Sequence, residues 1–258
     1  MSKKDVEQQR YSKVVKSNSL IQNSRFSLST QQQKIILFII SKLSSTSKDI
    51  EEYEFKVKEF CEVCGISLHS DIYDIIRKQI KDIADKSIWI TLDNGDEALV
   101  RWIDRPKISK RSGTIIIQID PTMKPYLLQL KEKFTEYELI YTLNLKSKYS
   151  IRLYEYLKSI HYNKLIPYTI TIPIEQFQKT LDSNYAKFKD FHARALKPAS
   201  EEINNFTDIN FTYELITRGR TTTDIKITIE TKDITDRVRT VKQLNETLDN
   251  PKEVKKDE

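Results

Sequence analysis

Basic side chains recur through residues 187–203 at a spacing that places them on one face of a helix. With successive side chains turned by about 100°, one apolar stripe would hold Phe188, Phe191, Ala195, Ala199 and Ile203. The opposite face would carry Lys187, Lys189, Ala193, Arg194 and Lys197. Ammonium and guanidinium groups hold DNA phosphates, and arginine also reads guanine through paired hydrogen bonds. These residues therefore indicate binding to double-stranded DNA, with Arg194 as the candidate for reading guanine and the lysines for guanine or phosphate.

Two residues of this segment do not fit a plain basic helix. Ala193 would be exposed between the cations, where its methyl group either contacts a thymine methyl or serves only as a good helix former. Pro198 lacks the amide hydrogen that a helix interior needs, and its ring clashes with the preceding turn. We therefore expect a kink or a break at Pro198, with base contacts coming from Lys187 through Lys197.

A β-hairpin with a cationic tip follows this helix. Residues 208–217 and 222–230 read as its strands, and Arg218-Gly219-Arg220 join them. Because glycine permits a tight turn, both guanidinium groups would lie at the end of the hairpin. There they would face a minor groove or a phosphate backbone, unless the tip is only a solvated turn. A basic helix followed by a basic hairpin is typical of a winged helix-turn-helix bound to DNA.

The sequence supports a metal site or a catalytic site less well than it supports DNA binding. Cys61 and Cys64 form a C-x-x-C pair, but a structural zinc site needs four ligands, and His69, His161 and His192 are scattered singly. We interpret the cysteines as packed side chains and expect no metal and no cofactor. The histidines offer no His-x-His unit for a metal-dependent DNA-nicking enzyme, and no G-x-x-x-x-G-K loop for a nucleotide triphosphatase occurs. A tyrosine recombinase would have to draw on Arg152, His192 and Tyr213, which fall in packing or DNA-facing positions, so we expect a non-catalytic protein.

The elements that would position the basic helix occur twice along the chain. Before it come a helix at 148–160, a strand at 168–172 and a short helix at 174–181. The first half repeats this order with a helix at 31–43 capped by Ser29 or Thr30, a strand at 53–57, a short helix at 58–64, a longer helix at 71–86, hairpin strands at 88–92 and 98–102, and a strand at 114–120. Phe55, Val57, Phe60 and Cys64 recur as Ile172, Ile174, Phe177 and Leu181 at one constant offset. The sequence therefore predicts an α+β protein of two tandem winged helix-turn-helix domains that arose by duplication.

Length and composition set the boundaries of these domains. The chain has 258 residues and a net charge of +6. We place an N-terminal domain at 14–133, a C-terminal domain at 134–232, a linking helix within 121–134 that starts near Pro125, and loosely ordered polar tails at 1–13 and 236–258. The N-terminus lacks the apolar run of a signal peptide, and no window is apolar enough to span a bilayer. We expect a cytoplasmic protein that does not bind membranes.

The longer helices of the two halves would occupy the same position but differ in charge. Residues 71–86 balance Arg77, Lys78, Lys81 and Lys86 against Asp71, Asp74, Asp82 and Asp85, whereas residues 187–200 set their cations against Asp190 alone. Only the second helix is electrostatically suited to enter a groove of DNA. In the first half, an irregular segment beside Gly113 carries further cations that form either a second phosphate clamp or a solvated loop, namely Lys107, Lys110 and Arg111.

Several short runs, in this order and spacing, resemble a known family. They are Asn18-Ser19-Leu20-Ile21, Leu28-Ser29, Phe134-Thr135 with Tyr137, Ser147-Lys148-Tyr149-Ser150-Ile151-Arg152-Leu153-Tyr154-Glu155, Glu202-Ile203-Asn204, Thr207-Asp208-Ile209, Tyr213-Glu214 and Gly219-Arg220. Together they resemble the plasmid replication initiators of the iteron-binding type, whose members carry two winged-helix domains. The likeness covers about residues 14–230 and is weakest between 45 and 120.

The resemblance implies binding of repeated origin sequences as a monomer, opening of the duplex, and recruitment of the host replication initiator and helicase. It also implies a homodimer, formed through the first domain, that binds an inverted repeat and represses the initiator's own gene. Carried onto this chain, the helix around Lys189 and Arg194 would read the repeat, and the Arg218 and Arg220 tip would steady it. The first-domain helix around Arg77, Lys78 and Lys81 would make secondary contacts. A transcriptional repressor without a replication role would use the same surfaces and stays open as an alternative.

Overall fold

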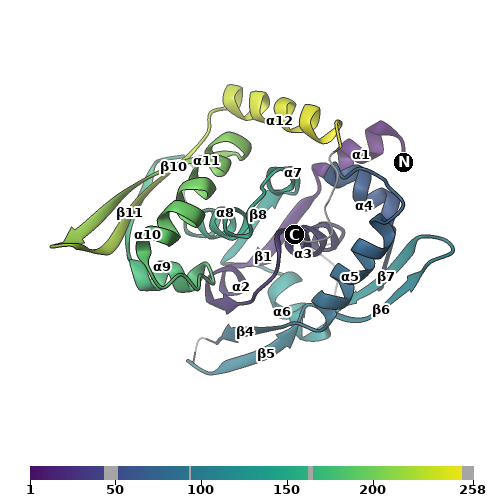
Figure 1. The fold of residues 1–258 in the computed structure, drawn as a ribbon, viewed down its shortest axis with the longest axis horizontal. Helices are drawn as coiled ribbons and strands as arrows, with labels where there is room; N and C mark the ends of the chain where they lie inside the picture. The colour runs from purple at the N-terminus through teal and green to yellow at the C-terminus, as the bar shows by residue number, and fades with distance from the viewer. Residues whose placement is uncertain (44–51, 93, 162–164, 252–258) are drawn as a thin grey trace.

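The computed structural model describes residues 1–43, 52–92, 94–161 and 165–251, and it contains the same unit twice in tandem (Figure 1). The first unit runs through α3 (Thr30–Ile40), β3 (Glu52–Lys56), α4 (Val57–Cys64), α5 (Ile72–Ala84), β6 (Ile103–Ser109) and β7 (Thr114–Ile119). The second runs through α8 (Lys148–Ile160), β9 (Tyr168–Pro173), α9 (Ile174–Thr180), α10 (Phe188–Phe191), a π-helical turn (His192–Leu196), α11 (Lys197–Phe206), β10 (Ile209–Arg218) and β11 (Thr221–Thr231). Both sheets have the same antiparallel order, β3-β7-β6 and β10-β11-β9, with the last strand in the middle.

The apolar positions that repeat along the sequence occupy matching places in the two units. Phe60 and Phe177 lie in α4 and α9 and are fully enclosed, and Phe55, Val57, Cys64, Ile172, Ile174 and Leu181 are also buried. Each helix is followed at the same offset by a residue with a left-handed backbone, Gly65 with φ 64° and Asp182 with φ 50°. The predicted repeat of helix, strand, helix and helix is therefore present in three dimensions.

The hairpin that closes the first unit differs from the one expected. β4 (Ser87–Thr91) and β5 (Glu97–Arg101) form a separate sheet with β2 (Ser24–Arg25), whereas the counterpart of β10–β11 is the hairpin β6–β7. The segment that we expected to be irregular is therefore largely a strand. The sequence did not predict β6 because Pro106 interrupts the strand. This proline lies at a shift in the pairing register, next to Arg105, whose φ is 40°. A proline is tolerated there because β6 is an edge strand.

The segment between the two units is less helical than the sequence indicated. Only a 3₁₀ turn (Pro121–Met123) and the short α6 (Lys124–Leu127) form, and left-handed residues follow at Gln129 and Lys133. β8 (Phe134–Glu138) then pairs with β1 (Lys13–Ser17), and α7 (Ile140–Leu143) leads into α8. β8 thus pairs across the boundary placed at residue 133, and that division stays a prediction.

α3 and α8 form the interior of the molecule. Residues Ile35 through Ile40 of α3 are all buried, which agrees with the prediction that a helix apolar on nearly all sides must be covered. Nearly every residue of α8 is buried as well. Ser29 begins α3 with a capping box, since its hydroxyl accepts from the Gln32 amide while the Gln32 side chain accepts from the Ser29 amide. α2 (Asn18–Asn23) packs beside α8. Within the described residues, no helix combines the length and apolar content that a bilayer span requires.

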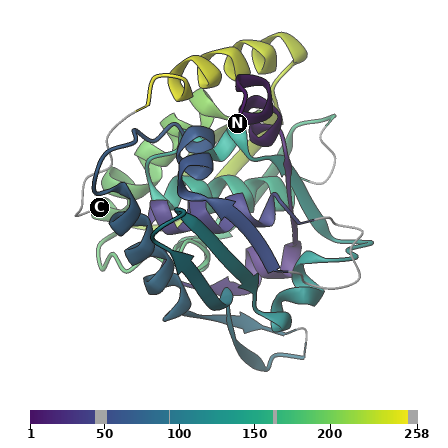
Figure 2. The same cartoon turned by 90° about the vertical axis from the view of Figure 1, so that its right-hand side faces the viewer.

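The polar ends of the chain are helical, so the expectation of loosely ordered tails was wrong for residues 3–10 and 236–248. α1 (Lys3–Arg10) and α12 (Ile234–Leu248) lie together in Figures 1 and 2. α12 ends against Gly65, where an added Cβ would lie 2.9 Å from the Leu248 backbone. The rest of the predicted C-terminal tail, 252–258, lies outside the described residues.

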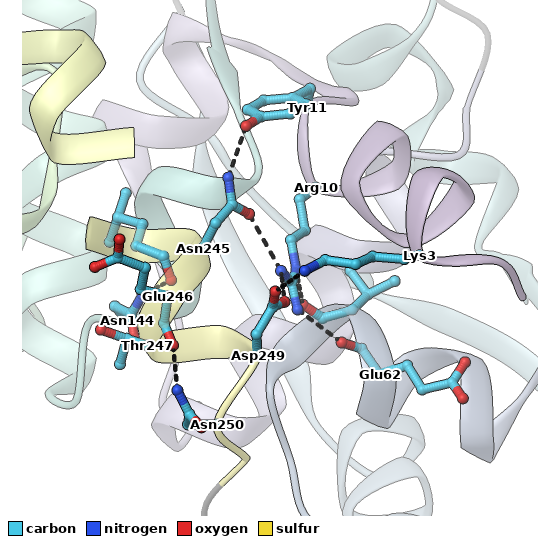
Figure 3. Close-up of polar contacts among 12 residues, drawn as sticks. Lys3, Arg10, Tyr11, Glu62, Asn144, Asn245, Glu246, Thr247, Asp249 and Asn250 are labelled. Atoms are coloured by element: carbon cyan, nitrogen blue, oxygen red, sulfur yellow. Dashed lines mark hydrogen bonds and ion pairs between the residues drawn. The ribbon is translucent and has the colours of Figure 1, made fainter. Parts of the chain in front are cut away.

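Arg10 joins the two ends of the chain to the first unit (Figure 3). Its side chain is almost completely buried and donates to the carbonyl oxygens of Val63 and Glu62, both at 3.0 Å. It also donates to the α12 side chain of Asn245 at 3.1 Å and to the Asp249 carboxylate at 2.8 Å. These contacts hold the pKa of Asp249 below its ordinary value. From the sequence alone Arg10 would be expected to be exposed to solvent, yet its side chain connects α1, α4 and α12.

We expect Arg10→Ala to lower the free energy of unfolding by about 2 to 4 kcal/mol, because it removes a buried charged partner and leaves two carbonyl oxygens without donors. Urea denaturation at neutral pH measures the loss. Lys3→Ala is the matched control, since Lys3 contacts the same Asp249 at 2.9 Å with a side chain that is 75% exposed. That control should lose much less stability, because an exposed ion pair contributes little, and equal losses in the two variants would contradict a central role for Arg10.

Candidate nucleic-acid interface

The predicted basic helix is built by a fully enclosed apolar face. Phe191, Ala195, Leu196, Ala199 and Ile203 each have no exposed surface. The Phe191 ring lies 6.0 Å from that of Phe177 on α9, in an edge-to-face arrangement that favours aromatic pairs. α9 and α10 therefore have the relation of the two helices in a helix-turn-helix, with the outer face of the second helix turned to solvent.

Pro198 neither breaks nor ends this helix, which continues to Phe206. Instead, residues His192–Leu196 form a π-helical turn, and the Lys197 amide donates to the His192 carbonyl oxygen, five residues back. The wider turn accommodates a proline that has no amide hydrogen and whose ring would crowd the preceding carbonyl. The extra residue also explains why Ala195 and Leu196 are both buried side by side. The expected kink is thus replaced by a local widening directly beneath Arg194.

The cations of this helix are exposed and form no ion pairs with the residues that the structure describes. Lys187, Lys189, Arg194 and Lys197 are all exposed, and so is Ala193 between them. Throughout the described part of the chain, no carboxylate lies within ion-pair distance of any of these cations. Because no described carboxylate neutralises them, these groups are available to an external anion.

A polar corner connects the basic helix to its hairpin. Asn204 on α11 exchanges two hydrogen bonds with the backbone of Phe211 on β10, at 2.8 and 3.0 Å. Asp208 accepts from Tyr154 at 2.8 Å and from Lys158 at 2.6 Å, both on α8. The corner is therefore attached to the buried core, which sets the direction in which β10 leaves the helix.

The β10–β11 hairpin carries its two arginines as the sequence predicted. Arg218 and Arg220 are exposed on either side of Gly219, whose φ of 64° is the left-handed conformation that the turn requires. Neither guanidinium has an ion-pair partner among the residues that the structure describes. The hairpin projects from one end of the molecule in Figure 1.

The first unit places its candidates on the corresponding elements. Lys110, Arg111 and Gly113 form the tip of β6–β7, and the φ of 65° at Gly113 matches that of Gly219. Lys107 lies in β6, where it pairs with Glu52 at 3.4 Å. A signal that sequence reading missed is this shared glycine at the tips of both hairpins. Figure 1 shows the two hairpins at opposite ends of the long axis, so the structure does not bring their cations together.

The counterpart helix α5 neutralises part of its own charge. Arg77 lies 3.9 Å from Asp74, and Lys81 lies 2.7 Å from Asp85. Lys78 is exposed and has no ion pair among the described residues. α5 therefore presents fewer free cations than the helix of the second unit.

The two units match known families. Residues 13–158 match the family model described as "Initiator Replication protein, WH1", and residues 173–229 match the one described as "Initiator Rep protein, WH2". The chain belongs to this replication initiator family. A replication initiation protein of Escherichia coli is 27% identical to this initiator over 226 residues, which cover 84% of this chain and 69% of that protein.

A solved structure shows the same fold. The crystal structure of the Pi initiator protein in complex with iteron DNA superposes with a TM-score of 0.70 and 18% identity, over 87% of this chain and 99% of that one. The predicted pair of winged-helix domains in an α+β protein is therefore confirmed, and so is the resemblance to replication initiators.

His192 and Tyr213 are a polar pair beside the basic face of this initiator. The His192 Nε2 atom lies 3.0 Å from the Tyr213 hydroxyl, which links the π-helical turn to β10. Partial burial raises the pKa of Tyr213 above its ordinary value near 10, so its hydroxyl stays protonated at neutral pH. Arg152, the third member of the recombinase set, is buried and donates to the carbonyl oxygens of Ser24 and Thr180 at 2.9 and 2.7 Å. Its guanidinium is thus committed to holding α8 in place.

The two cysteines of the initiator are packed side chains in α4, as predicted. Cys61 and Cys64 are buried and not bonded to each other, and burial raises the pKa of Cys61 to about 12 and that of Cys64 further. Among the residues described, no three metal-ligating side chains gather into a site. The C-x-x-C spacing here follows from a helix that buries one face and ends at Gly65.

We expect both thiols to be inert in the native initiator, because a thiol reacts as its thiolate and burial disfavours that form. At pH 8, labelling by a disulfide reagent should be slower in the native protein than in denaturant by roughly two orders of magnitude. Absorbance of the released thiol measures the rate. Stoichiometric labelling of the folded protein within the same time as the denatured protein would contradict the packed interpretation.

Proposed function

We propose that this initiator binds directly repeated sequences at a plasmid origin, with the α10–α11 helix in the major groove, and that it opens the duplex there. The observation that carries the proposal is the set of exposed, unneutralised cations on that helix, Lys187, Lys189, Arg194 and Lys197. Cations already paired inside a protein gain little from phosphate, whereas free ones release counterions from DNA and gain affinity. The chain's membership of the replication initiator family supports the same proposal.

The residues divide by chemistry into reading and holding roles. Arg194 reads guanine through its two-pronged guanidinium, and the lysines hold phosphates or read guanine. Ala193 lies exposed between them, where its methyl group can meet a thymine methyl. Arg218 and Arg220 contact the adjacent minor groove or backbone from the hairpin tip.

The first unit makes the secondary contacts. Its free cations are Lys78 on α5 and Lys110 and Arg111 at the β6–β7 tip, whereas Arg77, Lys81 and Lys107 must first leave their carboxylates. The two hairpins at opposite ends of the molecule support a binding site that spans about two turns of duplex. Weak contacts from the first unit would then add affinity without deciding the sequence.

The proposed role is non-catalytic and cytoplasmic, with the host replication initiator and helicase recruited after binding. Arg152 is committed to buried carbonyl oxygens, so a strand-cleaving site around His192 and Tyr213 lacks its arginine. A repressor without a replication role would use the same contacts. Footprinting on DNA that flanks the gene separates the two, because direct repeats beside an AT-rich tract support initiation and a lone palindrome supports repression.

A homodimer formed through the first domain is part of the proposal. Trp89 and Leu99 are cross-strand partners on β4 and β5 that are 44% and 55% exposed. Within the described residues, β5 pairs only with β4, which leaves one edge of that sheet open. Open edges with exposed apolar residues favour pairing with a second chain. This dimer would bind an inverted repeat and repress the initiator's gene.

Arg194→Ala should weaken binding to the specific repeat by about 1 to 3 kcal/mol and relax preference at one base pair. The physical reason is that alanine keeps the helix but removes both guanine hydrogen bonds. Fluorescence anisotropy on a repeat and its single-base variants measures the change. Lys242→Ala, on exposed α12, is the control and should leave affinity unchanged. A uniform loss on every sequence would show that Arg194 holds phosphate instead.

Leu99→Glu should raise the dimer dissociation constant about tenfold or more, because it sets a charge on the exposed apolar pair at the open edge. Sedimentation equilibrium measures the constant. Leu68→Glu changes the same residue type at 50% exposure elsewhere in the first unit and should have no effect. If both variants or neither of them shift the equilibrium, the dimer does not form at this edge.

A further inference from the structure

A cavity of about 610 Å³ lies where the first domain, the connection to α8 and the end of α12 meet. The cavity is lined by Gln31 and Lys34 from α3, Ile66 from the turn after α4, Lys146 from the connection, Lys148 from the first turn of α8, and Leu248 from α12. None of these residues belongs to the DNA-facing set, and the cavity is separate from α10 and from both hairpin tips. Its volume is within the range of small-molecule sites, about 300 to 1,000 Å³.

The lysines that line this cavity form no ion pairs with the described carboxylates. The Lys34 ammonium donates to the Leu143 carbonyl oxygen at 2.6 Å, and no carboxylate in the described part of the chain lies within ion-pair distance of it. Burial lowers the pKa of Lys34, and the more distant Glu202 opposes this only in part. The Glu202 carboxylate is occupied by the backbone amides of Lys146 and Ser147, at 2.9 and 3.4 Å. An ammonium taken out of water with one neutral acceptor is costly, so an anion in the cavity would relieve it.

Other donors on the cavity wall also lack acceptors. The Gln31 Nε2 atom is enclosed and has no hydrogen-bond partner in the described structure. Lys146 and Lys148 form no ion pair with any described carboxylate, and the Lys148 ammonium lies 5.0 Å from the centre of the Tyr149 ring. The wall thus offers several cationic and neutral donors to one ligand that brings only acceptors.

Part of the cavity lining is apolar. Ile66, Leu143 and Leu248 contribute carbon surface to the same cavity. A free inorganic anion would leave that surface in contact with water, whereas a ligand with a ring or hydrocarbon part would cover it. The cationic and apolar parts of the lining together match a molecule that carries both phosphate groups and an apolar or aromatic group.

We propose that this cavity binds a phosphorylated small molecule of nucleotide size, with Lys34, Lys146, Lys148 and Gln31 on its phosphates and Ile66, Leu143 and Leu248 on its ring. The ligand would touch the first domain, the connection and α12 at once, so its binding stabilises their mutual arrangement. This inference stands apart from the proposed DNA-binding role, because it uses none of the same side chains.

The test measures binding of ADP to the full-length chain by calorimetry and by thermal unfolding, with adenosine and pyrophosphate as the two half-ligands. ADP should raise the unfolding temperature and bind at least about tenfold more tightly than either half-ligand. Lys34→Met should reduce ADP affinity at least about tenfold. The protein's own unfolding temperature should change little, because relief of a buried charge that has no described carboxylate partner offsets the lost hydrogen bond to the Leu143 carbonyl oxygen. Gln31→Leu is a second variant and should reduce ADP affinity several-fold.

Matched controls keep this result separate from binding on the DNA-facing surface. Lys242→Met removes an exposed lysine of α12, and the double variant Lys189→Ala, Arg194→Ala removes cations of the reading helix; both should bind ADP like the wild type. The proposal would be overturned if the wild type did not bind ADP, or if Lys34→Met and Gln31→Leu bound ADP as tightly as the wild type. It would also be overturned if pyrophosphate bound as tightly as ADP, or if the double variant lost ADP binding. Loss of DNA binding alone in the double variant bears only on the proposed function.

Discussion

The charged side chains of α8 lie inside the initiator, and their pairing ties the rest of the structure together. Glu155 pairs with Lys16 of β1 at 2.6 Å, and Lys158 pairs with Asp208 at 2.6 Å, with three of these four side chains less than about 7% exposed. Arg152 donates hydrogen bonds to the carbonyl oxygens of Ser24 and Thr180. A buried ion that loses its partner costs several kcal/mol. Each pair therefore fixes the segment opposite α8, and those segments belong to both halves of the chain.

This constraint sets the direction of the helix that carries the exposed cations. Asp208 begins the turn from α11 into β10, so its contact with α8 sets the helix and the hairpin as one body. Lys16 and Ser24 bind the same helix from the N-terminal side. Asn204 and Asp208, which carry part of the family resemblance, form hydrogen bonds within the second unit that attach α11 and β10 to its core.

Local signals allowed much of the fold to be predicted. Periodicity gave the repeated helix order, Ser29 gave the start of α3, and Gly65 gave the end of α4. The errors arose where long-range contacts override local pattern. β6 pairs despite Pro106 because β7 supplies its partners, and α12 docks through a few buried residues such as Leu244 and Leu248 on an otherwise polar helix.

The candidate site was also predictable where local pattern decides and unpredictable where long-range contacts do. Its exposed cations could be assigned from the helical period, because each of the positions predicted to face solvent does so. The π-helical turn could not, since a five-residue hydrogen bond leaves no periodic trace over so short a stretch. The pairing of His192 with Tyr213 also depends on how β10 returns past the helix, which sequence separation does not reveal.

The two units differ in their acids more than in their bases. α5 and its ends carry Arg77, Lys78, Lys81 and Lys86, as many cations as the helix of the second unit carries. Asp74 and Asp85 lie three and four residues from Arg77 and Lys81, which is the spacing that allows neutralisation on a helix surface. The second helix carries Asp190, Glu201 and Glu202, and none of these three forms an ion pair with a described cation. Glu202 instead accepts hydrogen bonds from the backbone amides of Lys146 and Ser147. The two helices therefore differ in how their acids are placed, because two carboxylates near α5 pair with cations on its own surface and those of the second helix do not.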